Sequence, residues 1–483
     1  MLKVLHPPTY GAEREYILRV VIGEWLGLDY AAEAGDVHSL QITRTDDPSH
    51  ARLEVADVLF STSPEAWLTE SSLPSEIASW SPDPPLPGVP GQLAVVFGRA
   101  VDNGTYLLAD RGLVRLGLDV FGAAFFMLTR YEELVSRQRD EFDRFSSRFS
   151  VLEKSDLLGR PIVNEHVELL WWALQSLWPD LARVPRQYRC LLSCDLDNLS
   201  IMGAGPWLAI RKVGGGSVRD SLRFGPWYGV LSRVAARWRA WQGVPGADAL
   251  DDVDFLMDQA EAHGCKFVFN FIAARPRSLR DPTYQIDRLG IRRLMRRIHE
   301  RGHELGFHGS YESFKDPAKI RREFNCLTRT AEEEGIVQPH WGGRQHYLRW
   351  EGPTTWQAYA DAGLAYDSTL TYADQAGFRC GTCYEFPVFN LLTRQPLKLF
   401  ERPLVVMDGT LYKCNYMRLS DPEALQTVAT LSRSCMNYKG DFTLLWHNGN
   451  TNTPEDRSRC VDLLRAAATG RITSLDSHGR GFA

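Results

Sequence analysis

The chain has 483 residues, of which 44% are hydrophobic and 24% charged, a composition typical of globular proteins and not of collagen-like or wholly disordered chains. At roughly 100–200 residues per domain, this length indicates two to four domains. Lys and Arg number 55 against 60 Asp and Glu, a formal net charge of −5, which argues against a protein whose main role is to coat nucleic acid.

Compartment and membrane association were considered from three features of the sequence. Nine cysteines in a long chain indicate reduced thiols rather than a disulfide framework. The amino terminus lacks the apolar core and cleavage site of a signal peptide. The longest apolar run, Val120–Leu128, is far shorter than the roughly 18–20 residues that cross a bilayer. The sequence therefore predicts a cytoplasmic protein without a transmembrane segment.

The front of the chain mixes helical and strand patterns. Residues 13–26 carry apolar side chains at helical spacing, and residues 93–97 are typical of a buried strand. Further helices are expected over residues 120–134 and 167–178, after which prolines end the pattern. We therefore predict an N-terminal mixed α/β accessory domain over residues 1–185.

Residues 186–483 alternate apolar runs of strand length with amphipathic helices, which is typical of parallel β/α units. The expected strands are Arg189–Cys194, Lys266–Phe271, His303–Phe307, a short run near Trp341, Leu364–Tyr366, Val405–Met407 and Phe442–Trp446. About seven such units are enough for a β/α barrel, and an open doubly wound sheet is the alternative. An insertion at residues 211–245 holds three consecutive glycines, which are expected to form a hinge or flexible connection, and a segment that is expected to form a helix with exposed arginines.

Polar side chains follow five of the expected strands. They are Asp195 with Asp197, then His308, then Arg344 with His346, then Asp367, and finally His447. The carboxyl ends of parallel strands meet at one edge of the sheet, so we expect these side chains to lie close together. Asp408 also follows a strand, the sixth, but its position before Gly409 is typical of a turn.

This set of residue types favours metal-assisted hydrolysis. Asp195 and Asp197 are two residues apart, so both carboxylates are expected to face one side, where a cation would relieve their repulsion. His308 can add a nitrogen ligand, which suits zinc or another divalent metal acting on water. His447 is then available as a general acid, and Arg344 can orient a carboxylate or stabilise an oxyanion.

In chain order, these segments resemble the five motifs of the NodB-type polysaccharide deacetylases, or carbohydrate esterase family 4. Gly302–Tyr311 resembles the second motif, which contains G-H-E-[IL]-G-x-H, and Ser193–Asp197 resembles the first, T-F-D-D-G. The third, fourth and last motifs are matched by Arg344, Tyr366–Ser368 and Leu444–His447. The resemblance covers about residues 188–450, and the front part is similar to an N-terminal extension of some bacterial deacetylase-like proteins of surface-polysaccharide gene clusters.

The resemblance implies a distorted (β/α)7 barrel that uses a divalent metal, with zinc expected, to remove N- or O-acetyl groups from a carbohydrate substrate. It implies Asp195 as general base, Asp197 and His308 as metal ligands, Arg344 as the residue that orients the base, His447 as general acid and Asp367 as the partner that tunes His447.

The first motif differs from the family pattern in one respect. The family has adjacent aspartates, whereas Leu196 separates Asp195 from Asp197 here. The roles of base and metal ligand could therefore be exchanged between these two residues.

The second motif lacks its second histidine. Glu312 occupies that position and is the expected third metal ligand, since a carboxylate is a competent oxygen donor. Ser313 and His346 are alternatives for completing the site.

The leading hypothesis is a metal-dependent hydrolase that deacetylates a sugar or glycan intermediate. A glycosyltransferase is an alternative because Asp195-x-Asp197 matches the D-x-D pattern that holds a metal with a sugar nucleotide, but it leaves His308 and His447 without a role. The third hypothesis is a non-catalytic glycan-binding relative, and the missing histidine of the second motif is the feature that supports it.

Overall fold

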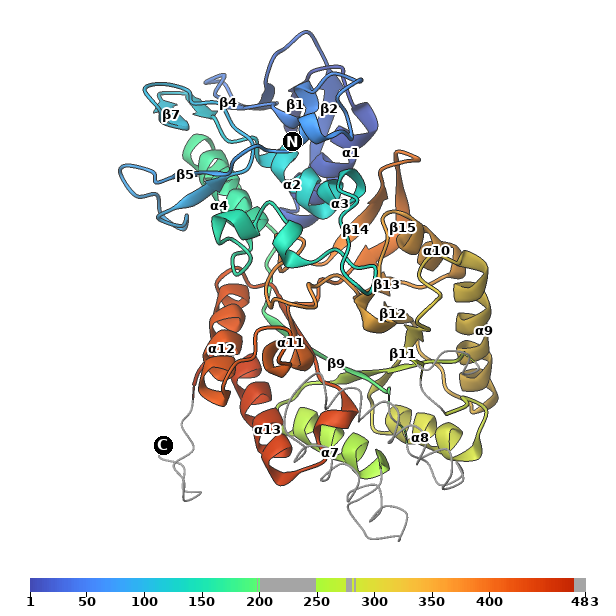
Figure 1. The fold of residues 1–483 in the computed structure, drawn as a ribbon. Coiled ribbons are helices and arrows are strands. Elements are labelled where there is room, and N and C mark those ends of the chain that lie inside the picture. Colours follow the sequence, from blue (N-terminus) through green and yellow to red (C-terminus); the bar gives the residue numbers. More distant parts are fainter. Residues whose placement is uncertain (198, 200–248, 275–279, 282–283, 473–483) are drawn as a thin grey trace. The chain divides into compact units, whose positions relative to one another are not determined.

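The computed structural model describes residues 1–197, 199, 249–274, 280–281 and 284–472 (Figure 1). Its chain divides into two compact units. Unit 1 comprises Met1–Gln187, Gly377–Pro403 and Tyr438–Gly440, and unit 2 comprises Tyr188–Ala376, Leu404–Asn437 and Asp441–Ala483. The sequence predicted one domain boundary near residue 185. It did not predict that two later segments, Gly377–Pro403 and Tyr438–Gly440, belong to unit 1. The insertion at 211–245, with its expected hinge and arginine-bearing helix, lies outside the described residues.

Unit 1 is built on a sheet with the strand order β2-β1-β3-β4-β8-β7. Its strands are β1 (Leu2–His6), β2 (Tyr30–Ala34), β3 (Leu40–Arg44), β4 (Arg52–Val55), β7 (Leu107–Asp110) and β8 (Leu113–Leu116). The pairs β1–β2 and β4–β8 are parallel, and the other neighbours are antiparallel. Two antiparallel pairs complete the unit, namely β5 (Ala78–Trp80) with β6 (Leu93–Val95) and β14 (Phe386–Asn390) with β15 (Gln395–Glu401).

The helices of unit 1 follow the apolar spacing of the sequence. They are α1 (Gly11–Leu18), a π-helical turn at Arg19–Trp25, α2 (Val120–Leu128), α3 (Tyr131–Val135) and α4 (Ile162–Leu177). The helix expected over residues 120–134 is divided because Arg130 adopts a left-handed conformation, with φ of 54°. Asp119 begins α2 by accepting a hydrogen bond from the Gly122 N–H at 2.7 Å. A Cβ at position 122 would lie 2.2 Å from Asp119 Oδ2, so this cap requires glycine.

A buried ion cluster stabilises unit 1. The Glu133 carboxylate accepts hydrogen bonds from Arg130 Nε at 2.8 Å and from Arg379 Nη2 at 2.6 Å. Burial by itself would raise the pKa of Glu133, but the two guanidinium groups outweigh it and lower the pKa to about 2. Because the folded-state pKa is lower than the ordinary value of 4.5, this stabilisation is complete above about pH 4.5 and is lost as the pH falls toward 2.

Replacing Glu133 with Gln is expected to lower the free energy of unfolding by about 3–5 kcal/mol, because the buried carboxylate that Arg130 and Arg379 share is then lost, and Arg130 keeps its ion pair with Glu132. Thermal and urea unfolding at pH 7 measure this effect. The matched control is Asp180→Asn, which breaks the ion pair with Arg44 in the same unit, where the Asp180 side chain is 66% exposed. That variant is expected to have a free energy of unfolding close to that of the unaltered protein. Equal effects of the two substitutions would contradict the importance of the buried cluster.

Unit 2 contains a parallel sheet with the strand order β13-β12-β11-β10-β9-β17-β16. The strands are β9 (Arg189–Asp195), β10 (Phe267–Phe271), β11 (Glu304–Gly309), β12 (Gly342–Gln345), β13 (Tyr366–Asp367), β16 (Val406–Met407) and β17 (Asp441–Leu445). Each corresponds to one of the apolar runs expected from the sequence. The sheet is curled, and the backbone N–H of Leu404, before β16, donates to the carbonyl of Leu370, after β13, at 3.2 Å.

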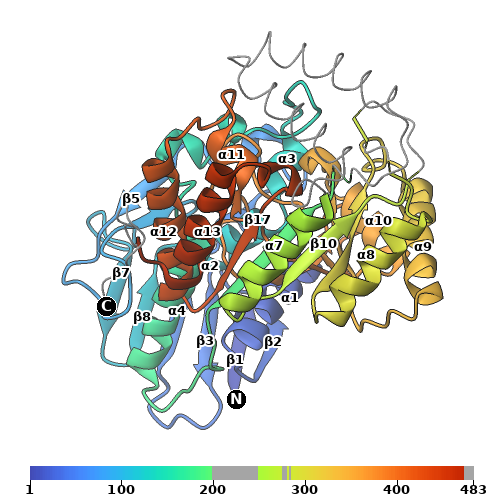
Figure 2. The ribbon, with the colours of Figure 1, turned by 90° about the horizontal axis from the view of Figure 1, so that it is seen from below.

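Seven helices of unit 2 pack around this sheet in the described part of the chain. They are α7 (Ala249–Ala262), α8 (Leu289–Glu300), α9 (Pro317–Glu333), α10 (Thr354–Ala362), α11 (Asp408–Tyr412), α12 (Asp421–Asn437) and α13 (Pro454–Thr469). Helix α7 contacts β10, α8 and α9 contact β11, and α12 contacts β17 (Figure 2). In α8 the apolar stripe is buried and the arginines lie on the other face, where Arg292 pairs with Glu333 at 2.6 Å.

The predicted fold class is therefore confirmed. The chain is an α/β protein with an N-terminal α/β sheet domain followed by a curled parallel sheet of β/α units. Within the described residues, none of the helices combines the length and the apolarity needed to cross a membrane.

Candidate metal centre

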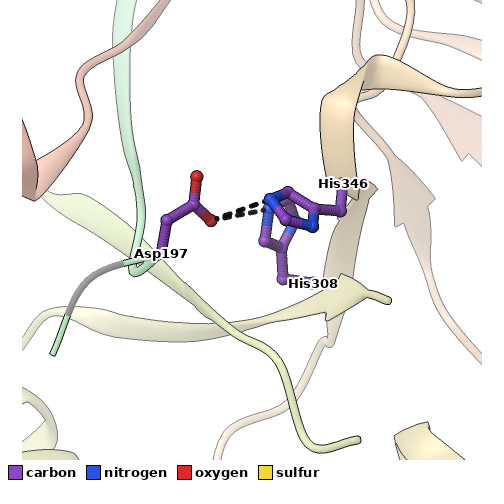
Figure 3. A group of neighbouring side chains, drawn as sticks. All are labelled: Asp197, His308 and His346. Carbon is purple, nitrogen blue, oxygen red and sulfur yellow. Dashed lines mark ion pairs between the residues drawn. The ribbon is translucent and has the colours of Figure 1, made fainter. Parts of the chain in front are cut away.

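Three side chains from neighbouring parts of the unit 2 sheet form a group that could hold a metal ion. They are Asp197 after β9, His308 on β11 and His346 after β12 (Figure 3). Nε2 of His308 and Nε2 of His346 each lie 3.4 Å from Asp197 Oδ1. One donor atom from each residue lies within 4.8 Å of the other two. Two imidazole nitrogens with one carboxylate oxygen form a donor set that suits zinc and several other divalent metals.

The hydrogen bonding of these residues fits a cation. His308 Nδ1 lies 2.8 Å from the backbone carbonyl of Arg344 and so carries the proton, which leaves the Nε2 lone pair directed at the group. His308 Nε2 and Asp197 Oδ1 are buried and form no hydrogen bond. Buried polar atoms without partners are costly, and a cation between them would satisfy both. The residues present therefore fit a divalent metal.

The charges of the group are strongly coupled. Burial would raise the pKa of Asp197, but His346 and His308 outweigh it and hold the pKa well below its usual range. Burial would lower the pKa of His346, but Asp197 and Asp281 outweigh it and raise the pKa to about 9. A metal ion competes with this proton for the imidazole, so metal affinity should weaken as the pH falls.

Asp281 lies on the far side of His346 from the group. Its Oδ1 is 3.5 Å from His346 Nδ1 and accepts the backbone N–H of Tyr311 at 2.8 Å. Carboxylates in this position commonly orient metal-binding imidazoles. The sequence contained no signal for Asp281, because it lies between β10 and α8 and follows no strand directly.

The structure does not place Glu312 in the group. Its side chain is 62% exposed, and its carboxylate lies 3.7 Å from Arg349. The third member of the group is instead His346, which was the alternative. The reason is the pairing of β11 with β12, in which His308 lies opposite Arg344, so that a residue shortly after Arg344 reaches the same edge of the sheet.

Asp195 is held beside the group by two donors. Its Oδ1 accepts from Arg344 Nη1 at 2.9 Å and from Asn270 Nδ2 at 2.7 Å, and its Oδ2 lies 3.6 Å from His308 Nε2. Burial would raise the pKa of Asp195, but the neighbouring His308 and Arg344 outweigh it and lower the pKa. A Cβ at Gly306 would lie 1.9 Å from Asn270 Oδ1, so the glycine makes room for this amide. Asp195 is therefore ionised, with one oxygen fixed.

Arg344 is itself buried, with its side chain 1% exposed. Besides Asp195, its guanidinium donates to the Ser368 carbonyl at 2.8 Å and to Ser193 Oγ at 3.0 Å. Asn270 was not expected from the sequence. The available signal was one amide side chain within the apolar run Phe267–Phe271.

His447 pairs with Asp408. His447 Nδ1 lies 2.7 Å from Asp408 Oδ1, and Asp408 Oδ2 accepts the His447 N–H at 2.9 Å and Asn450 Nδ2 at 2.7 Å. Burial would lower the pKa of His447, but Asp408 outweighs it and raises the pKa to about 9. His447 Nε2 lies 3.8 Å from Asp197 Oδ2, so this dyad and the Asp197 group share one site.

The contacts of Asp367 differ from those expected. Its Oδ1 accepts the Thr369 N–H at 3.0 Å and the Thr369 hydroxyl, and burial raises its pKa to about 7. The carboxylate on His447 is Asp408, which the sequence suggested was a turn residue. Strands β16 and β17 are paired with Met407 opposite Leu445, and this pairing brings Asp408 next to His447.

One family model and several solved structures are similar to parts of the chain. Residues 2–179 match the model of a family of unknown function (DUF7033). Among curated proteins, none matches the chain. A solved structure from Mycobacterium smegmatis, described as a polysaccharide deacetylase, is 17% identical with a TM-score of 0.38, over 60% of this chain and 86% of that one.

Two further solved structures are similar to parts of the chain. A family 4 carbohydrate esterase from Streptomyces lividans, in complex with acetate, is 14% identical with a TM-score of 0.26, over 47% of this chain and 92% of that one. The PuuE allantoinase is 12% identical with a TM-score of 0.34, over 59% of this chain and 88% of that one. At these identities and TM-scores the matches assign no reaction to this chain.

Proposed function

We propose that this protein is a metal-dependent hydrolase that removes an acetyl group from a sugar or glycan intermediate. The observation that carries the proposal is the meeting of three elements around Asp197. They are a donor set for a divalent metal, a fixed and ionised carboxylate at Asp195, and a protonated imidazole at His447. General base, general acid and a metal are the components that hydrolysis of an acyl group requires.

The roles follow from the hydrogen bonds. Asp197, His308 and His346 would hold the metal, which would supply Lewis acidity toward the acetyl carbonyl and lower the pKa of water. Arg344 and Asn270 occupy Oδ1 of Asp195, which leaves Oδ2 to accept a proton from water. This arrangement favours Asp195 over Asp197 as the base.

His447 acts from the other side of the site. Its Nδ1 is bonded to Asp408, so its Nε2 is the atom that donates a proton to the leaving group. A pKa of about 9 keeps His447 protonated at neutral pH. Proton donation matters more for an amine than for an alcohol, because an amine is the poorer leaving group. The dyad therefore favours N-acetyl over O-acetyl substrates.

The test combines metal analysis with product detection. Protein purified without chelator is expected to contain about one divalent metal per chain and to release acetate from N-acetylated oligosaccharides. Chelation should abolish acetate release, and re-addition of zinc should restore it. Release of UDP from UDP-sugars without acetate release would indicate the glycosyltransferase alternative. Bound metal without either product would indicate a non-catalytic glycan-binding protein.

The pH dependence of kcat/KM should reveal the partner of His447. Asp408→Asn removes the carboxylate that raises the pKa of His447, so the alkaline limb is expected to move from near pH 9 toward the ordinary imidazole value of 6.5. Such a shift leaves His447 about 3% protonated at pH 8. The value of kcat/KM is therefore expected to fall roughly 30-fold at pH 8 and by a smaller factor at pH 6.

Asp367→Asn is the matched control, because Asp367 is an equally buried carboxylate without a contact to His447. The alkaline limb of the kcat/KM profile should stay near pH 9 in Asp367→Asn. A limb that moves in Asp367→Asn and not in Asp408→Asn would contradict the assignment of the dyad.

A further inference from the structure

Cys190 lies at the amino end of β9, and Cys265 lies two residues before β10 begins, at the opposite end of these strands from Asp195 and Asn270. The strands are parallel neighbours, with Leu192 opposite Phe267. Cys190 and Cys265 each lie two residues before these positions, so extending the register past the start of β10 brings them opposite one another. Neighbouring strands are about 4.8 Å apart, which falls within the roughly 4.4–6.8 Å that separates the Cα atoms of disulfides.

The two thiols interact. The interaction with the Cys190 thiol lowers the pKa of Cys265 to about 7. The same interaction raises the pKa of Cys190 well above its usual value. Cys190 and Cys265 are both free and partly exposed, whereas Cys380 and Cys383 of the C-x-x-C segment are buried. The first pair therefore combines a thiolate, an adjacent second thiol and access from solvent.

We propose that Cys190 and Cys265 form a reversible dithiol–disulfide pair that exchanges with small-molecule disulfides of the glutathione class. The Cys265 thiolate attacks one sulfur of oxidised glutathione, an S–S bond to Cys265 forms, and one glutathione thiolate leaves. Cys190 then loses its proton and attacks the Cys265 sulfur of this mixed disulfide, and the second glutathione thiolate leaves. The two cysteines are oxidised, one glutathione disulfide is reduced to two thiols, and excess reduced glutathione reverses both steps.

The product would link two strands that each carry, at the other end, a residue beside the candidate metal centre. Asp195 ends β9, and Asn270, which donates to it, lies on β10. The bond also joins two residues that are 75 positions apart in the sequence, and a cross-link of this kind restricts the unfolded chain. Oxidised protein should therefore show a higher midpoint of thermal unfolding than reduced protein. This proposal does not depend on the hydrolase activity.

The experiment equilibrates the full chain with mixtures of reduced and oxidised glutathione, quenches with acid, alkylates the remaining thiols and maps peptides by mass spectrometry. The expected result is a peptide pair joined through Cys190 and Cys265, formed in oxidising mixtures and lost in reducing ones. In Cys190→Ser, glutathione should stay attached to Cys265, because no second thiol displaces it. In Cys265→Ser, Cys190 should remain largely reduced.

Cys326→Ser is the matched control, since Cys326 is also partly exposed and lies on α9. It should leave the linked peptides and the rise in the unfolding midpoint unchanged. The proposal is overturned if no linked peptide forms in any mixture, if Cys190 or Cys265 links preferentially to another cysteine, or if glutathione accumulates on Cys265 of the unaltered protein.

Discussion

Replacing His308 with alanine is expected to remove the bound divalent metal and abolish acetate release while the fold is retained. His308 supplies one of three donors, and its Nε2 makes no hydrogen bond that the fold would lose. Substitutions that merely disturb the partners of a metal ligand cost about 10–100-fold in affinity, so loss of a ligand should exceed 100-fold. Metal content by mass spectrometry, acetate release and circular dichroism measure the three parts of this prediction, and zinc titration measures the loss of affinity.

Two further variants show which residue is the third ligand. His346→Ala should match His308→Ala in metal affinity, because both imidazoles lie 3.4 Å from Asp197 Oδ1. Glu312→Ala should bind metal as tightly as the unaltered protein, since its side chain faces solvent. Unchanged metal content in His308→Ala would contradict the proposed centre. Loss of metal in Glu312→Ala, with retention in His346→Ala, would return the third position to Glu312.

Replacing His447 with alanine is expected to lower kcat/KM for an N-acetylated sugar by roughly 10²–10⁴-fold, the usual contribution of a positioned general acid. Bound metal should be retained, because the three donors do not include His447. The loss should be much smaller with 4-nitrophenyl acetate, whose leaving group departs without a proton. Rates at several pH values, together with metal analysis, separate loss of the acid from loss of the metal.

Asp195→Asn provides the complementary variant. It removes the base but leaves the three metal donors, so it should lose activity toward both substrates and keep its metal. Metal loss in Asp195→Asn with retention in Asp197→Asn would mean that the roles of the two aspartates are exchanged. Full activity of His447→Ala toward the N-acetylated sugar would show that another group delivers the proton.

The local pattern of residues was sufficient to predict the secondary-structure elements and part of the candidate site. Apolar runs predicted the seven parallel strands of unit 2, because burial on both faces requires continuous apolar residues. Polar residues after parallel strands gather at one edge of the sheet, and this rule correctly predicted from the sequence that Asp195, Asp197, His308 and Arg344 lie close together. These inferences need only the order of residues along each strand, and the sequence contains that order.

The partners of these residues depended on which strands are neighbours. His346 joins His308 because β12 lies beside β11, and Asp408 contacts His447 because β16 lies beside β17. From their positions in the motifs, Glu312 was expected as the third metal ligand and Asp367 as the partner of His447. Motif position does not specify where a side chain points after a turn. Likewise, Cys190 and Cys265 are far apart in sequence and meet only through the register of β9 with β10. Contacts between distant segments depend on strand order and register, which the tertiary structure alone decided.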